Sequence, residues 1–307
     1  MGLARAAGSL EAEAAALGGI GDACYAQARI RTGMEMIRRC LALAREHGFL
    51  RVEVAYTQMA GWCSYYLMDV RGSVAICRDL IGLAKRVMHR RGEMLARAQL
   101  VMVDGWVRGN WRDAAPHLDI AMQGAQAIGS PRFEAMCWQF RAMLAVRAGD
   151  LPAARENLRM AFEVAGSRAL PLVAAQLYGI SARIDPDPVT RKQALAKGEA
   201  SLALGGLSHN HFVFSDCAIE SSLDAGDWDE ADRYCHELEV YASTESVPWV
   251  DFVVTRGRAL ARVGRGERSA ELATALQALR QQGADADCNV YLAALDAALR
   301  QLAGPAA

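Results

Sequence analysis

Apolar segments long enough to form helices alternate along the chain with short polar turns that contain Gly and Asp. The turn AGDWDEA at 225–231 fits the connection between two antiparallel helices, with Asp227 as the N-cap of the second helix. Related turns occur at 67–73, 108–114 and 147–154. The pattern therefore predicts helical hairpins along the chain.

The cap residues of these turns follow a period of about 40 residues. Asp69, Asn110, Asp150 and Asp227 lie 41, 40 and 77 residues apart in succession, and Asp187 falls within the longest interval. A period of this length is typical of stacked helix-turn-helix units, because each unit buries its apolar face only against its neighbours. We therefore expect an all-α, tetratricopeptide-like helical-hairpin solenoid with a right-handed superhelix.

A single helical-repeat array is predicted over residues 1–307. Residues 1–8 fit the end of a truncated repeat, residues 9–283 about seven helix pairs, and residues 284–307 a capping helix and tail. The predicted pairs are 9–30 with 33–47, 50–67 with 72–88, 91–108 with 111–128, 131–148 with 151–166, 170–183 with 188–204, 210–225 with 228–243, and 247–263 with 267–282, before a last helix at 286–302.

Composition supports helices and narrows the classes of function. Hydrophobic residues make up 52% of the chain, whereas aromatic residues make up only 7%. The formal net charge is −1 without a basic block, so we expect no nucleic-acid partner. No signal peptide or apolar run of about 18 residues is present, so we expect a bacterial-type cytoplasmic protein that does not enter membranes. The eight cysteines lack paired spacing and are predicted to be buried helix residues.

One polar position recurs about ten residues before each turn. In tetratricopeptide-type repeats this position of the first helix faces the concave groove, where an amide can donate to and accept from a peptide backbone. The alternative is hydrogen bonding between helices. The predicted partner-binding groove contains Gln58, Gln99, Gln139, Gln176 and Asp216 as one stripe, with Trp62, Trp106 and Glu220 beside it.

Several segments outside the turns also resemble one family. They include RRCLALAREHGF at 38–49, SHNHF at 208–212, PWVDF at 248–252 and RGRAL at 256–260. With them, essentially the whole chain resembles the C-terminal tetratricopeptide region of bacterial proteins that join a class III adenylate/guanylate cyclase domain to a predicted ATPase domain. The resemblance implies a signalling context, in which this region senses or docks something for the catalytic domains of the same parent protein.

The chain itself lacks the motifs of an enzyme. No G-x-x-x-x-G-K-[ST] phosphate loop is present, and no nucleophile arrangement is recognisable around Ser208 and His209. His209 and His211 point apart at a two-residue spacing on a helix, so we expect them to cap the 210–225 helix rather than to bind a metal. We expect no cofactor and no metal.

Three functions remain open from the sequence, of which a free-standing enzyme is the third because helical arrays can host active sites. The first is a non-enzymatic regulatory or scaffolding region that binds a protein or peptide in its concave groove. The alternative is a small-molecule sensor with a pocket inside the superhelix, as in repeat-containing signalling or transcription regulators. Fold alone does not decide between them.

Overall fold

The computed structural model describes residues 8–303, and this part of the chain is helical without a strand. The helices form antiparallel pairs that pack consecutively on their neighbours, which confirms the prediction of an all-α helical-repeat solenoid. We call the first helix of each pair the A helix and the second the B helix. The first four pairs are α2 (Leu10–Ala26) with α3 (Ile30–Glu46), α4 (Leu50–Tyr66) with α5 (Val70–Arg86), α6 (Arg90–Leu100) with α7 (Trp111–Ala127), and α8 (Pro131–Arg147) with the first part of α9 (Leu151–Ile184).

The second part of α9 begins a new pair, because Gly166 interrupts this helix with φ 48° and ψ −165°. The remaining elements are α10 (Pro188–Ala203), α11 (Ser208–Asp224) with α12 (Trp228–Tyr241), α13 (Pro248–Gly264) with α14 (Ala270–Asp285), a 3-10 turn η2 (Asn289–Tyr291) and α15 (Leu292–Ala303). The predicted break near residue 166 is therefore confirmed. The predicted end of a truncated repeat at 1–8 lies almost entirely outside the described residues.

The predicted boundaries differ most at the first and last helices. The first A helix ends at Ala26 instead of residue 30, since Ala28 adopts a left-handed φ of 60° and turns the chain into α3. The last helix begins at Leu292 instead of residue 286, because a 3-10 turn precedes it.

Four of the five predicted aspartate and asparagine caps are confirmed. The carboxylates of Asp69, Asp150, Asp187 and Asp227 each accept a hydrogen bond from a backbone N–H in the first turn of the following helix. Asn110 is the exception. Its Nδ2 donates instead to Oδ1 of Asp104 at 2.7 Å.

This exception coincides with a π-helical segment, η1 (Val101–Val107), which continues α6. The sequence predicted one uninterrupted α-helix over 91–108. A π-helical turn holds more residues than an α-helical turn, so side chains after Gln99 are rotated relative to the other repeats. Asp104 of η1 also accepts from Arg108 at 2.9 Å and from Arg78 at 3.0 Å.

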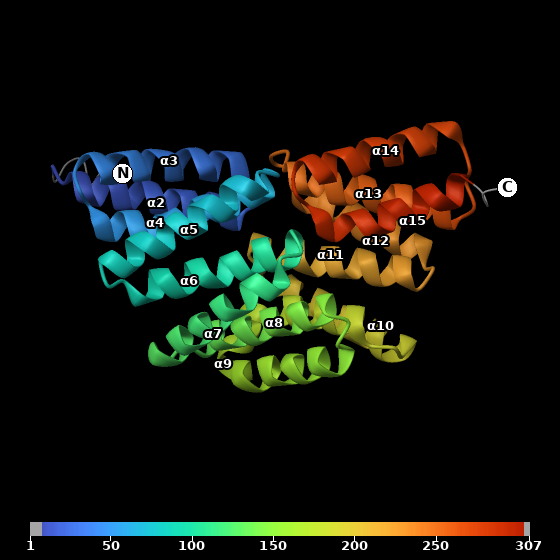
Figure 1. Ribbon diagram of the computed structural model, residues 1–307, viewed down its shortest axis with the longest axis horizontal. Helices are drawn as coiled ribbons and strands as arrows, with labels where there is room; N and C mark the ends of the chain where they lie inside the picture. Colours follow the sequence, from blue (N-terminus) through green and yellow to red (C-terminus); the bar gives the residue numbers. More distant parts are fainter. Residues whose placement is uncertain (1–7, 304–307) are drawn as a thin grey trace.

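The array curves until its early and late repeats touch. Figure 1 shows the first helices, in blue, beside the last helices, in red, with the middle of the chain below them. Helix α2 contacts α11, α4 contacts α13, and η1 contacts η2. Aromatic residues pack across this seam, where Tyr66 lies 4.7 Å from Phe212 and 5.5 Å from Trp249 between ring centroids. The described repeats therefore form a closed ring.

All eight cysteines are buried and free, as predicted. None of the described helices combines the length and apolar character needed to cross a bilayer.

Candidate functional site

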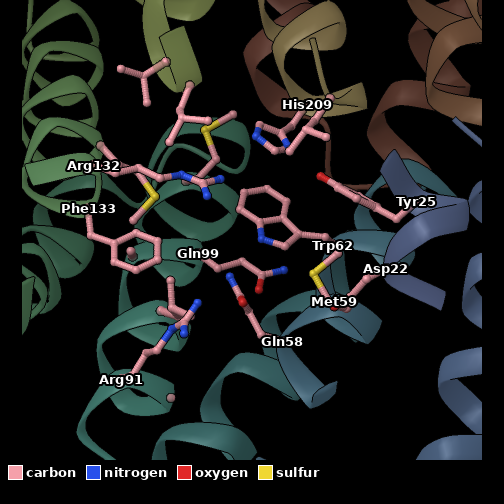
Figure 2. A pocket seen from close by; sticks show the side chains of 18 of the residues that line it. Asp22, Tyr25, Gln58, Met59, Trp62, Arg91, Gln99, Arg132, Phe133 and His209 are labelled. Carbon is pink, nitrogen blue, oxygen red and sulfur yellow. The ribbon is translucent and has the colours of Figure 1, made fainter. Parts of the chain in front are cut away.

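A cavity of about 540 Å³ lies on the inner side of the ring. Its lining comes from six consecutive A helices, namely α2, α4, α6 with η1, α8, the second part of α9, and α11, together with the residues that precede α6 and α11. No B helix contributes a lining residue. Figure 2 shows side chains from several of these helices pointing toward one central space.

Five of the eight predicted groove residues line this cavity. They are Gln58, Trp62, Gln99, Gln139 and Gln176. The equal offset of the glutamines from their turns places them on the inner faces of successive A helices. Trp62 is half-buried, and its indole lies near the centre of the view in Figure 2.

The buried glutamines differ in their hydrogen bonds. Nε2 of Gln139 donates to Oε1 of Gln176 at 2.9 Å, and Nε2 of Gln176 donates to Oδ1 of Asn210 at 2.6 Å. These two amides thus join three A helices. This is the inter-helix alternative that the sequence left open.

Gln99 has no such partner. Its side chain is only 1% exposed, yet neither Nε2 nor Oε1 has a hydrogen-bond partner among the described residues. The amide packs on Gly61 of α4, where a Cβ would lie 2.6 Å from Nε2. Because a buried amide without a partner is costly, Gln99 is a candidate to bind something in the cavity.

The other three predicted residues, Trp106, Asp216 and Glu220, do not line this cavity. Trp106 is buried in η1, with the guanidinium groups of Arg147 and Arg183 at 5.8 and 5.4 Å from its ring. Its offset from Gln99 includes the π-helical turn, so the predicted alignment with Trp62 is not kept.

Asp216 and Glu220 belong to a buried charge cluster within the ring. Glu220 pairs with Arg256, which is 1% exposed, and lies 3.7 Å from Arg183. Burial acts to raise the pKa of Glu220, but Arg256 and Arg183 hold it below its ordinary value. Burial and the neighbouring Glu220 raise the pKa of Asp216 to about 6. Neither carboxylate lines the cavity, so they do not extend the glutamine stripe as predicted.

A cationic wall of the cavity was missed in the sequence. Arg91 and Arg132 are the second residues of the successive A helices α6 and α8. Their Cζ atoms lie 5.5 and 5.7 Å from the ring centroid of Phe133. Both arginines line the cavity. Within residues 8–303, no carboxylate forms an ion pair with either of them. A signal was available, since Arg51, Arg91 and Arg132 are 40 and 41 residues apart.

Asp22 of α2 faces the cavity from the opposite side to this wall (Figure 2). Its Oδ1 has no hydrogen-bond partner among the described residues, and burial raises its pKa to about 6. The two walls therefore carry opposite charge when Asp22 is ionised.

His209 also lines the cavity, but not as a helix cap. Its ring stacks on Tyr25 at 6.0 Å, and burial together with Arg132 lowers its pKa to about 4. His211 stacks instead on Tyr241 at 3.7 Å. The N-cap of α11 is Leu207, which makes no side-chain capping bond, so the predicted capping role was wrong.

The described residues contain no group of three His, Cys, Asp or Glu side chains that could hold a metal ion. No protein-family model matches the chain, and no curated protein matches it significantly.

Proposed function

We propose that this protein is a small-molecule sensor that binds its ligand in the cavity inside the closed ring. The observation that carries the proposal is a cavity of about 540 Å³ that six consecutive A helices line. This volume lies within the range of roughly 300–1,000 Å³ that is usual for ligand pockets. The cavity lining combines apolar side chains such as Met59 and Met136 with a few polar groups, which is also usual for ligand pockets.

Two contacts favour a small ligand over the protein or peptide partner. A peptide in the groove would need a continuous row of free amides, but Gln139 and Gln176 bond to each other and to Asn210. Tyr66 lines the cavity and packs on Phe212 and Trp249, so the seam is closed at the edge of the cavity. A long peptide could follow the concave surface only if this seam opened.

The position of the cavity suggests how binding would be sensed. Tyr25 and Ala26 line it from the first repeat, whereas Leu207 and His209 line it from a late repeat. A ligand between them would touch both sides of the seam and stabilise the closed ring by mass action. Ligand binding would thereby be linked to the closure of the array.

Binding of N-phenyl-1-naphthylamine, a neutral probe that fluoresces in apolar pockets, tests the proposal. We expect one probe molecule per protein. Met136→Trp fills the cavity and should abolish the fluorescence increase, whereas Ile120→Trp adds the same side chain at an exposed position of α7 outside the cavity lining and should not. Equal binding to both variants, or no binding to the unmodified protein, would contradict a ligand cavity.

The signalling context stays a prediction. If the resemblance to cyclase–ATPase proteins holds, the ring would report its ligand to catalytic domains of the same parent protein. The gene sequence upstream of Met1 tests this directly, because cyclase or ATPase segments would be encoded there.

A further inference from the structure

We propose that the ligand is an aromatic organic anion whose acidic group lies between Arg91 and Arg132. The proposal rests on the proposed function, since it names the chemical class that the same cavity would take. Three independent features of the cavity lead to it: an unpaired cationic wall, a buried amide without a partner, and flat apolar surfaces between them.

The cationic wall is the first feature. Arg91 is exposed and Arg132 is half-buried, so their guanidinium groups lead from the surface into the cavity. Burial and the nearby charge of Arg91 lower the pKa of Arg132 from its ordinary value, which indicates that the two cations repel each other. An anion between them would remove this repulsion and accept charge-assisted hydrogen bonds from both.

Two more deeply buried arginines each have a carboxylate partner. Arg97 pairs with Glu93 at 2.8 Å, and Arg256 pairs with Glu220. Buried cations are normally paired in this way, because an unpaired charge away from water is costly. Arg132 is a half-buried cation at the cavity and has no carboxylate partner among the described residues. An anionic ligand would supply this missing partner.

The amide of Gln99 is the second feature. It offers one donor group and one acceptor atom at the cavity, both without a partner within the described chain. Gly61 leaves room for this amide, because a Cβ at that position would lie 2.6 Å from Nε2. A ligand with a polar atom on its body would satisfy it, and Gln99 would then orient the ligand.

The third feature is the shape of the apolar surface. The rings of Phe133 and Trp62 project into the cavity from α8 and α4, and both are labelled in Figure 2. A planar aromatic body fits such surfaces, because aromatic rings stack in offset or edge-on arrangements. Ionised Asp22 on the opposite side would repel an acidic group, so the anionic end should point toward the arginines.

Two fluorescent probes separate the anion from the cavity. We would titrate the protein with 8-anilinonaphthalene-1-sulfonate, an aromatic anion, and with the neutral N-phenyl-1-naphthylamine. We expect Arg91→Gln and Arg132→Gln each to weaken sulfonate binding about tenfold, as loss of a charge-assisted hydrogen bond predicts. Binding of the neutral probe should change less than about twofold. Arg90→Gln, at the neighbouring exposed position outside the lining, is the matched control.

Arg132→Lys keeps the positive charge and should retain most sulfonate binding. This variant therefore distinguishes loss of the charge from misfolding caused by substitution at this position. Competition with benzoate, phenyl phosphate and neutral benzamide then distinguishes a carboxylate from a phosphate ligand, and both anions should displace the sulfonate better than benzamide does. If both probes bind equally and neither arginine variant matters, the anion proposal is wrong although the cavity binds ligands. If neither probe responds to Met136→Trp, the proposed function itself fails.

Discussion

Ser208 and Tyr25 are hydrogen-bonded across 183 residues of sequence. The hydroxyl of Ser208, at the first residue of α11, donates to the carbonyl oxygen of Tyr25 near the end of α2. The same Oγ accepts from the N–H of Ala28 at 2.7 Å. Tyr25 and His209 also line the cavity. The side chain of Ser208 therefore joins the two sides of the seam next to the candidate ligand site.

We expect Ser208→Ala to lower the free energy of unfolding by about 1 kcal/mol, because the N–H of Ala28 and the carbonyl of Tyr25 each lose the Ser208 hydroxyl although they keep their mutual hydrogen bond at 3.1 Å. Urea denaturation measures this. Ser201→Ala is the control, since Ser201 is half-buried in α10 and its Oγ bonds only within that helix, to the carbonyl of Lys197. An equal effect of the two substitutions would mean that the seam bond contributes nothing specific.

Gln99 and Gln139 should respond in opposite directions to the same change. Gln99→Leu removes a buried amide that has no partner, so we expect the protein without ligand to gain about 1 kcal/mol of stability. Gln139→Leu breaks the bond to Gln176 and should cost about 1–2 kcal/mol. Thermal unfolding of the two variants gives the comparison.

Binding adds a second measurement to this pair. Gln99→Leu should weaken the binding of a ligand that uses the amide, despite the gain in stability. If Gln99→Leu destabilised the protein as much as Gln139→Leu, the amide of Gln99 would have to be a structural group.

Asp22 predicts a pH dependence of stability. Burial raises its folded-state pKa to about 6 from an ordinary value of 3.8. The protonated form is therefore favoured by folding, and its stabilising contribution is complete below about pH 4 and lost as pH rises through about 6. We expect Asp22→Asn to be more stable than the unmodified protein by about 1 kcal/mol at pH 8, after allowance for solvent screening.

The same variant should lose most of this advantage at pH 4, where Asp22 is protonated in the folded state and only partly ionised in the unfolded state. Equilibrium unfolding in urea at pH 4, 6 and 8 measures the difference between the two proteins. A constant difference across this range would contradict the raised pKa.

Arg256 and Arg258 provide a matched pair on α13. Arg256→Met leaves Glu220 buried with only the more distant Arg183, so we expect a loss of about 3 kcal/mol. Arg258 pairs with Glu239 at 2.8 Å, but both side chains are exposed. Arg258→Met should therefore cost less than about 1 kcal/mol. Similar losses from both substitutions would show that the buried pair is not the stabilising element.

The features that the sequence predicted are those that repeat locally. Helix pairs, the aspartate caps and the inner position of Gln58, Gln99, Gln139 and Gln176 follow from the period and the turn residues, because each repeat packs in a similar way on the next. The cationic wall follows the same period, at Arg91 and Arg132, and could have been found in the same way.

The features that the sequence did not predict depend on which side chains meet between packed helices and on a local departure from α-helical geometry. Whether a glutamine finds a partner depends on which side chain faces it, as Asn210 does for Gln176. Trp106 lies in the π-helical segment η1 and therefore leaves the predicted face. The residue types at 101–107 do not predict this segment. Asp216 lies among Glu220 of its own helix and Arg183 and Arg256 of the A helices on either side, and the sequence does not indicate which of these side chains meet.

Closure of the ring has a consequence for how the chain can fold and vary. In an open solenoid each repeat contacts only its neighbours, so repeats can be gained or lost and the ends can unravel separately. Here Arg71 bonds Asp287 at 2.8 Å across 216 residues, and Tyr66 packs on Trp249. Such contacts between distant residues slow folding and couple the first repeats to the last. Deleting or inserting one 40-residue unit would move these partners apart, so the number of repeats is fixed by the circumference of the ring.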